Sequence, residues 1–487
     1  MIIRPYLGVI ILLVIICLPI FAHLGEMPIQ VWDEGRLACS ALEMYESGDP
    51  LVVTYDGQPE MWSTKPPLLI WIQVLFLKAF GISDFVFRLP TALAAVLTCL
   101  CLYWFLAKKM NKAWWGIAAV IILVSTPGYV RQHSIRSGDY DSLLCLFTTL
   151  YVLCFYLFIH ENSKKYFNAT IVFLILACLT KGVAGVIFLP LLVGYAAFKK
   201  KLLTILKMKE FYLGVAAFFV FVVGYYVLRE QYNPGYIKAV LENEITGRYN
   251  KVIEEHKGNG WFYYNFLTID GFKPWHLLFV VGSVIGFVSK ERQIRELTAY
   301  LLLCSLGYII ILSNGATKLD WYMVPTYPLL SALTAISLYT ICELLIDTAF
   351  WKKHLNVNLL PHLFIFLLCI SPFSQTVSYA INTKKSTYNE AADDAGLVLQ
   401  KQINDGYMFD RPMRLVAYDY QSGVEWYLKA CKLKNIPVKK VDKWDVDKGV
   451  LALVYQDELK SFMEQQYDAR IVATYDKATV YLVNGRK

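Results

Sequence analysis

Long apolar runs alternate with short basic connections over the first three quarters of the chain. About 20 consecutive apolar residues are enough for one helical membrane crossing, and on that measure residues 1–382 contain roughly eleven spans. The pattern predicts an α-helical polytopic membrane domain. The spans are expected to begin near Tyr6, Phe85, Trp114, Tyr140, Phe167, Val183, Phe211, Pro274, Leu297, Trp321 and Asn358.

Basic residues set the expected orientation of these spans. Lysines and arginines gather in alternate short loops, for example 108–112 and 199–209, and the positive-inside rule places such loops in the cytoplasm. The other loops are then expected to face outward together. They are 24–84, 131–139, 229–273 and 313–320.

Two further segments depart from the pattern of long spans. Residues 66–81 are apolar but short, and outer sequence flanks them on both sides, which favours an interfacial helix. From residue 383 the chain becomes mixed polar, as expected of a small α/β domain of residues 383–487 on the outer side. Its predicted elements are helices 389–403, 424–430 and 457–466, strands 413–418 and 449–455, and a hairpin over 470–484.

Composition excludes an ordinary soluble protein. Of 487 residues, 56% are hydrophobic and only 18% are charged. The net charge of +8 comes from the alternate basic loops, so it reflects membrane topology and does not indicate a nucleic-acid partner. Most of the 11 cysteines lie inside apolar spans, so we expect neither a disulfide framework nor a zinc site.

The first outer loop carries the clearest candidate chemistry. Asp33 and Glu34 follow the first span, Arg36 lies one helical turn beyond Asp33, and Lys65 precedes two prolines. Transfer from a phosphate-linked substrate needs a base for the incoming nucleophile and positive charge for the leaving phosphate. Asp is also a favoured helix N-cap residue, so a purely structural role for Asp33 is an equal alternative.

A second acidic pair lies at the start of the fourth span. Asp139 and Asp141 are two residues apart, so on a helix they would point in nearly opposite directions. We therefore expect Asp141 to face the site and Asp139 to cap the helix. An acidic residue just inside a membrane span is costly unless it is paired or functional.

The later outer loops supply further candidates. Arg248 and Lys318 are possible phosphate contacts, although Lys318 could equally be a membrane anchor, and Tyr249, His256 and Tyr322 are possible substrate contacts. The sequence contains no G-x-G-x-x-G, P-loop or H-E-x-x-H motif. Motif support is thus lacking for a nucleotide-sugar enzyme, an ATPase or a zinc protease.

The order of short motifs resembles a known group of enzymes. The motifs DEGR…ESGD, KPPLLIW with RLPTAL, RSGDYDSLL, LTKG, ENEITGRYN…H…WFYY, GFKPW and KLDWYMVPTYP follow one another over about Val31 to Leu333. They are similar to those of the bacterial polyprenyl-phosphate-dependent glycosyltransferases of the GT-C fold, the superfamily of aminoarabinose lipid A transferases and protein O-mannosyltransferases.

The resemblance implies roles for particular residues. Asp33 matches the catalytic carboxylate, Arg36 and Lys65 match contacts of the lipid phosphate, and Asp141 matches the second essential aspartate, with Asp139 as the alternative register. Glu34 is grouped with these acids, and His256 matches a histidine of the later loop. Thr64 stands where the aminoarabinose transferases have a glutamate involved in metal binding. This difference argues against a bound divalent metal and against aminoarabinose as the sugar, so no metal ligands are assigned and no other cofactor is implied.

These observations predict an inverting glycosyltransferase with Asp33 as general base. It would move a hexosyl or pentosyl group from a polyprenyl (undecaprenyl) monophosphate carrier to lipid A, a glycan or a protein. We expect a monomer among the lipids of the bacterial inner membrane, with the active site and C-terminal domain facing the periplasm. A transporter or lipid flippase is the alternative, but transporters usually place ionisable residues at mid-membrane in repeated halves. A scaffold or sensor would leave the clustered carboxylates without a role.

Overall fold

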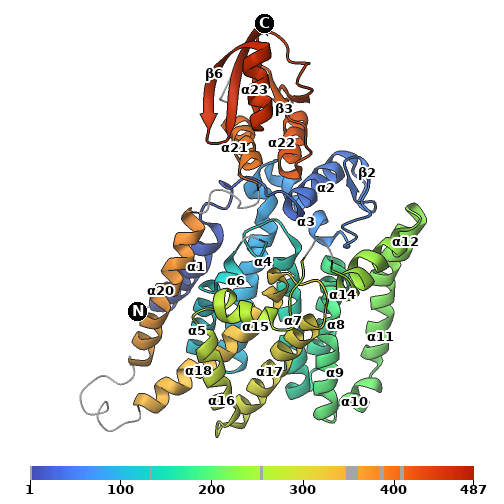
Figure 1. Ribbon diagram of the computed structural model, residues 1–487. Coiled ribbons are helices and arrows are strands. Elements are labelled where there is room, and N and C mark those ends of the chain that lie inside the picture. Colours follow the sequence, from blue (N-terminus) through green and yellow to red (C-terminus); the bar gives the residue numbers. More distant parts are fainter. Residues whose placement is uncertain (1–2, 132, 253–255, 347–359, 383–388, 406–410) are drawn as a thin grey trace.

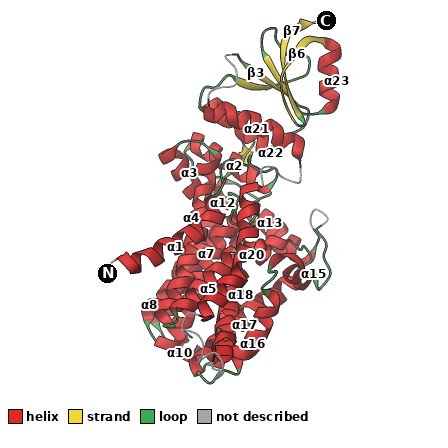
Figure 2. Ribbon diagram, turned by 90° about the vertical axis from the view of Figure 1, so that its left-hand side faces the viewer, coloured by secondary structure: helices red, strands yellow, loops and turns green. Residues whose placement is uncertain are grey.

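The computed structural model describes residues 3–131, 133–252, 256–346, 360–382, 389–405 and 411–487. It consists of a helical bundle with a small α/β domain at one end (Figure 1). The short segments of the first outer loop lie between the two parts (Figure 1, Figure 2). The predicted division at about residue 383 falls beside residues 383–388, which are outside the described residues.

Each of the eleven predicted spans overlaps a helix of the bundle. Five stretches among the described residues are long and apolar enough to cross a membrane, namely 84–109, 140–161, 164–186, 209–232 and 292–313. A multi-pass membrane architecture is confirmed, while the number of eleven crossings stays a prediction. The main bundle helices are α1 (Ile3–Phe21), α4 (Asp84–Trp104), α5 (Ala113–Val124), α7 (Tyr140–Glu161), α8 (Lys164–Lys181), α9 (Leu189–Phe198), α11 (Lys209–Phe218), α12 (Gly224–Tyr232), α16 (His276–Phe287), α17 (Arg292–Ser313), α18 (Tyr327–Ile346) and α20 (Leu360–Asn382).

Shorter helical segments connect these helices. The short α-helices are α6 (Pro127–Val130), α10 (Leu202–Leu206), α13 (Tyr236–Val240), α14 (Arg248–Asn250) and α15 (Phe262–Phe266). Tighter 3₁₀ turns occur at Gly182–Val186 and Asp320–Thr326, and wider π turns at Phe105–Lys109, Phe219–Val223, Leu241–Gly247 and Leu267–Gly271.

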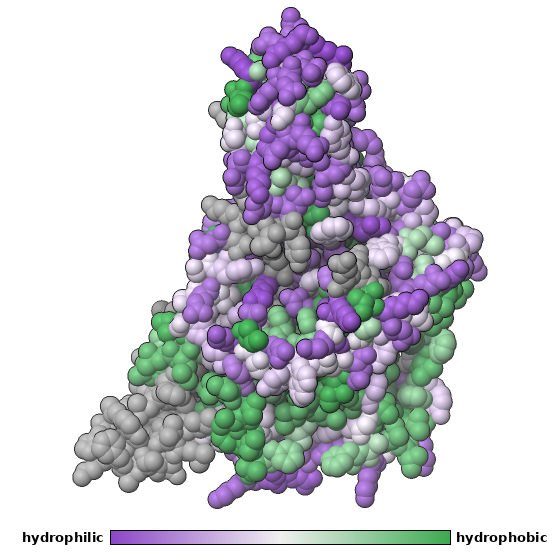
Figure 3. Space-filling model, viewed as in Figure 1, coloured by the Kyte–Doolittle hydropathy of each residue, from purple (hydrophilic) through white to green (hydrophobic). Residues whose placement is uncertain are grey.

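The bundle surface is apolar where a lipid bilayer would contact it. Hydrophobic side chains gather over the lower half of the molecule, and hydrophilic ones cover the upper half and the α/β domain (Figure 3). On α11 and α16, Leu213, Leu277, Val280 and Val284 are each more than half exposed. Such large apolar exposure is typical of a lipid-facing surface.

The first outer loop folds into α2 (Asp33–Ser47), a small hairpin of β1 (Thr54–Tyr55) and β2 (Gln58–Pro59), and α3 (Leu68–Phe80). Helix α3 corresponds to the interfacial helix predicted over 66–81. It buries Leu69, Ile70 and Leu77 and exposes Leu75 and Phe80, as a helix lying at a boundary should.

The C-terminal domain contains a five-stranded mixed sheet. The strand order is β4-β3-β5-β7-β6, with β3 parallel to β4 and β5, and β7 antiparallel to β5 and β6. The predicted elements of this domain are confirmed, and within residues 389–405 and 411–487 the strand that the sequence analysis missed is β4, in which Val438 is buried and its neighbours are not. The elements are α21 (Glu390–Asp405), β3 (Met413–Val416), α22 (Ser422–Leu433), β4 (Val438–Val441), β5 (Leu451–Val454), α23 (Asp457–Gln466), β6 (Tyr467–Tyr475) and β7 (Ala478–Arg486).

A buried ion pair ties the first loop to α4. The guanidinium of Arg88 donates from Nε to Glu34 Oε1 at 2.7 Å and from Nη2 to Glu34 Oε2 at 2.8 Å. Its Nη1 also donates to the backbone carbonyls of Leu24 and Met27, at 2.8 and 2.6 Å. Neither Glu34 nor Arg88 is exposed to solvent, so these partners replace the water that both charges lose on burial.

Removing one member of this pair should destabilise the fold strongly. Arg88→Ala leaves the Glu34 carboxylate buried without its cation, which typically costs about 3–5 kcal/mol. Lys109→Ala is the control, because it removes a partly exposed ion pair with Glu161 that is worth less than about 1 kcal/mol. Unfolding free energies in mixed detergent micelles would measure both, and equal losses for the two variants would contradict this account.

Candidate active site

The Asp33 side chain lines a cavity where the outer loop meets the bundle. Arg36, Lys65, Asp139 and Asp141 line the same cavity, so the structure brings together residues that lie more than a hundred positions apart. Helix α2 begins at Asp33, but its N-cap residue is Trp32 and no side chain caps it. The capping role that the sequence left open for Asp33 is therefore wrong.

Both acids at the start of α7 face this cavity. Asp139 is the N-cap of α7, as predicted, and its Oδ1 accepts from Tyr140 N at 2.6 Å. The expectation that only one acid could face the site was wrong, because Asp139 precedes the helix in an extended conformation with φ −94° and ψ 166°. The pKa of Asp139 lies below its ordinary value, since His133 and Lys181 outweigh the opposing effect of burial.

Lys181 is the cation that the sequence analysis did not select. Its Nζ donates to both carboxylate oxygens of Asp141, at 2.7 and 2.6 Å, from the last residue of α8. Both side chains are buried and both line the cavity. A lone lysine between two apolar runs is the signal that could have identified it, because an ionisable residue within a membrane span is usually functional.

Glu34 is not part of the cavity lining. Its carboxylate is fully buried, and besides the ion pair with Arg88 its Oε1 accepts from Gly138 N at 2.6 Å. Glu34 follows Asp33 and Gly138 precedes Asp139, so this hydrogen bond sets the two cavity acids opposite one another. Since Glu34 does not line the cavity, the structure does not bring it together with the acids with which the sequence analysis grouped it.

The two predicted phosphate contacts of the first loop both line the cavity. Arg36 is paired with Glu60, with Nε 2.5 Å from Oε2 and Nη2 2.9 Å from Oε1, and its guanidinium lies 4.0 Å from the centre of the Tyr55 ring. Burial would raise the pKa of Glu60, but Arg36 outweighs this effect and the pKa lies below its ordinary value. Lys65 Nζ lies 3.5 Å from Glu244 Oε1.

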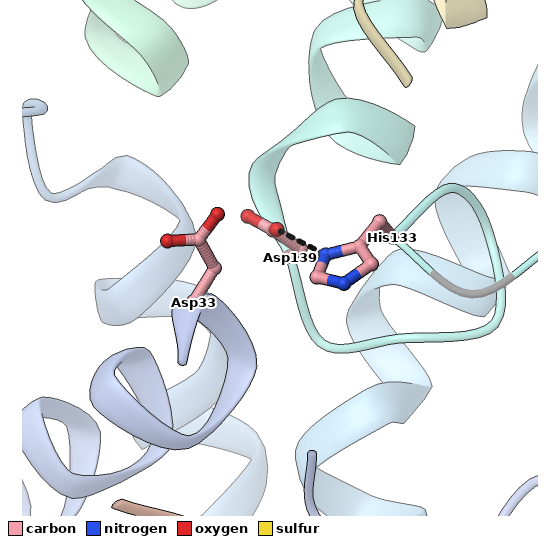
Figure 4. Close-up of side chains that lie close together, drawn as sticks. All are labelled: Asp33, His133 and Asp139. Atoms are coloured by element: carbon pink, nitrogen blue, oxygen red, sulfur yellow. Dashed lines mark ion pairs between the residues drawn. The ribbon is translucent and has the colours of Figure 1, made fainter. Parts of the chain in front are cut away.

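His133 joins the two acids in a group that sequence reasoning missed (Figure 4). One ligand atom each from Asp33, His133 and Asp139 lies within 4.8 Å of the others. The His133 ring stacks on Trp321, with centroids 4.5 Å apart, and its Nδ1 lies 3.9 Å from Asp139 Oδ2. Burial lowers the pKa of His133, but the two carboxylates outweigh it, so the pKa is raised. Two carboxylates and an imidazole are also a donor set that suits a divalent cation.

The charged cavity continues into an apolar groove. Lys65, Lys181, Val183 and Glu244 line both. Beyond them the groove is bounded by apolar side chains of α8, α11, α12 and the turns between them. These include Cys178, Val186, Phe218, Val222 and Val227. The arrangement suits an amphiphile with an anionic end and a long hydrocarbon tail.

The remaining predicted contacts fall in different places. Tyr249 and Tyr322 line the cavity. Lys318 does not, because its Nζ donates to the carbonyls of Ser313 and Gly315 at 2.7 and 2.6 Å, so a structural role fits it better than phosphate binding. His256 is exposed and is not among the lining residues. The side chain of Arg248 lies outside the described residues.

Thr64, which stands where the resembled aminoarabinose transferases have a glutamate, is buried and lines the apolar groove. Its backbone carbonyl accepts from the Tyr236 hydroxyl at 2.9 Å. Thr64 offers no carboxylate at this position, and the described residues that could hold a cation are Asp33, His133 and Asp139.

Sequence comparisons point to enzymes that use lipid-linked sugars. Residues 64–226 match the family model described as dolichyl-phosphate-mannose-protein mannosyltransferase. An uncharacterized protein of Aquifex aeolicus is 26% identical over 321 residues, covering 65% of this chain and 60% of that protein. An undecaprenyl phosphate-alpha-4-amino-4-deoxy-L-arabinose arabinosyl transferase of Aeromonas hydrophila is 24% identical over 323 residues, 64% of this chain and 56% of its own length. The matched regions thus span less than two thirds of these relatives.

Solved structures show the same architecture over nearly the whole chain. ArnT from Cupriavidus metallidurans bound to undecaprenyl phosphate aligns with a TM-score of 0.70 and 18% identity, covering 98% of this chain and 97% of that one. The Archaeoglobus fulgidus oligosaccharyltransferase aligns with a TM-score of 0.55 and 11% identity, covering 89% and 64%. The chain has the GT-C fold of the polyprenyl-phosphate-sugar glycosyltransferases, as its motifs indicated.

Proposed function

We propose that this protein is a glycosyltransferase that takes a sugar from a polyprenyl monophosphate carrier. The observation that carries the proposal is a cavity lined by four carboxylates and three cations that opens directly into an apolar groove. A phosphate with a polyprenyl tail matches both halves of that site. The relatives named for undecaprenyl phosphate-linked and dolichyl phosphate-linked sugars support the same donor class.

Asp33 is proposed as the general base. As the acceptor oxygen attacks the anomeric carbon, its proton passes to the Asp33 carboxylate, the bond from that carbon to the phosphate oxygen breaks, and the configuration inverts. The phosphate is a good leaving group, so no separate general acid is needed. Asp141 is held by Lys181, so we assign it to orienting the acceptor and stabilising positive charge on the sugar.

The cations would hold the departing phosphate. Lys65 and Lys181 stand where the cavity meets the groove, and therefore where the charged head of a lipid would pass into its tail. Glu60 fixes Arg36 through Nε and Nη2, which leaves Nη1 for a phosphate oxygen. In a cavity shielded from water these interactions are stronger than they would be in bulk solvent.

The trio of Asp33, His133 and Asp139 would hold a divalent cation if one binds. Such a cation would add positive charge beside the departing phosphate. The imidazolium form of His133, which the raised pKa favours, places a positive charge beside the carboxylate of Asp139 by itself (Figure 4).

We further propose that the site faces the periplasm from the bacterial inner membrane, because the basic loops lie on the opposite side. Lipid A, a glycan or a protein would be the acceptor, and the sugar would be a hexose or a pentose. The protein would act as a monomer. The transporter alternative has no supporting observation, since the cavity charges gather where α7 begins and α8 ends, close to the outer loop.

Asp33→Asn should abolish transfer without abolishing donor binding. Loss of a general base typically costs roughly a hundredfold to ten-thousandfold in rate. The assay would use nanodisc-embedded protein and undecaprenyl phosphate carrying labelled mannose or 4-amino-4-deoxy-L-arabinose, with acceptor-rich envelope extract. Asp56→Asn is the matched control, because Asp56 is exposed in the same loop. Transfer at the wild-type rate by Asp33→Asn would show that the base is misassigned.

Lys181→Met tests whether the Lys181–Asp141 pair serves chemistry or only stability. The single change leaves Asp141 buried without its cation, so both stability and transfer should fall. The double variant Lys181→Met with Asp141→Asn removes both charges and should recover the thermal unfolding midpoint, while transfer stays at least about a hundredfold below wild type. Recovery of transfer together with stability would assign the pair a structural role alone.

A further inference from the structure

The C-terminal domain is built onto the segment that presents Asp33. Helices α21 and α22 lie directly on the first outer loop and on the start of α4 (Figure 1, Figure 2). Where α22 meets α2 and the segment before it, glycines allow the two backbones to approach closely. A Cβ added to Gly35 would lie 2.6 Å from Ser422 Oγ, and one added to Gly423 would lie 2.4 Å from Ile29 O. Only glycine permits this approach.

Trp32, the residue before Asp33, has an unusual backbone conformation. Its φ is +81° and its ψ is −119°, which an L side chain rarely adopts and which persists only where the surroundings enforce it. The C-terminal domain contacts Trp32 directly. Trp32 N donates to Ser422 Oγ at 3.1 Å, and Ser422 Oγ lies 3.5 Å from Trp32 O.

A second anchor holds the segment that leads into Trp32. The Tyr427 hydroxyl accepts from Ile29 N at 2.9 Å and donates to the buried carboxylate of Asp84. Trp426 Nε1 and Gln400 Nε2 also donate to Asp84, at 3.0 and 2.5 Å. Three side chains of the C-terminal domain thereby bind one carboxylate at the start of α4, and the domain is fixed to the bundle on both sides of the turn at Trp32.

We infer that the C-terminal domain positions the proposed base, with Ser422 holding the Trp32 turn so that the Asp33 carboxylate points into the cavity. Ser422 is not among the residues that line the cavity and acts on Asp33 through Trp32, so it is a positioning residue. The inference rests on the proposed function, because it assigns a role in presenting the general base.

The test is a mutant cycle between Ser422 and Trp32. Ser422→Ala should lower kcat for transfer roughly tenfold or more, as expected when a reacting group is displaced by a fraction of an ångström, with KM for the lipid donor unchanged. Trp32→Gly accepts the same backbone angles without strain. In that background Ser422→Ala should cost less than about twofold in kcat, because the turn no longer depends on the hydroxyl.

Lys432→Ala is the matched control. It removes another contact between α22 and α2, the exposed ion pair with Glu46, and should leave kcat at the wild-type value. Hydrogen exchange gives a readout independent of transfer: amides of residues 28–36 should exchange faster in Ser422→Ala than in wild type or Lys432→Ala.

Three results would overturn the inference. In the first, Ser422→Ala lowers kcat by the same factor whether residue 32 is Trp or Gly. In the second, Ser422→Ala raises KM for the lipid donor and leaves kcat unchanged. In the third, the amides of residues 28–36 exchange at the wild-type rate in Ser422→Ala. Activity of Asp33→Asn at the wild-type level would instead refute the proposed function, and it is measured in the same assay so that the two failures are distinguishable.

Discussion

One buried carboxylate determines the geometry of the candidate site. Glu34 is fully buried, and its oxygens accept from Arg88, from Gln30 N and from Gly138 N. A buried charge is tolerated only when such partners replace water, so the segments that supply them must come together for the chain to fold. Glu34 adjoins Asp33 in the sequence and Gly138 adjoins Asp139. The contacts that stabilise the buried Glu34 carboxylate therefore also set the spacing of the two cavity acids.

The cavity combines features that conflict in an ordinary protein interior. Acids and cations are gathered at the edge of an apolar groove, where each charge needs a partner: Asp141 has Lys181, Arg36 has Glu60, and Lys65 lies near Glu244. Asp33 differs from the other acids, since its side chain is exposed into the cavity from the first turn of α2. A carboxylate at the open end of a charged cavity is well placed to accept a proton from an incoming acceptor. The paired charges supply the electrostatic field that acts on the reacting groups.

The fold could be predicted largely because long apolar runs and alternating strands leave direct patterns in the sequence. The presence of Asp33 and Lys65 in the cavity was predictable from their place beside a membrane boundary. The pairings were not predictable. Lys181 and Asp141 meet from two different helices, and His133 meets Asp139 through the turns and bends of residues 133–139. Lys318 resembled a phosphate ligand in sequence, yet it binds backbone carbonyls, a contact that no local pattern records.

The most direct measurement is a cryo-EM structure of the protein with undecaprenyl phosphate in a lipid nanodisc. The account predicts phosphate density in contact with Lys65 and Lys181, beside Asp33, and tail density along the groove bounded by Val186, Phe218 and Val222. Phosphate density elsewhere on the protein, with the cavity of Asp33, Asp139 and Asp141 bound to no lipid head group, would contradict it.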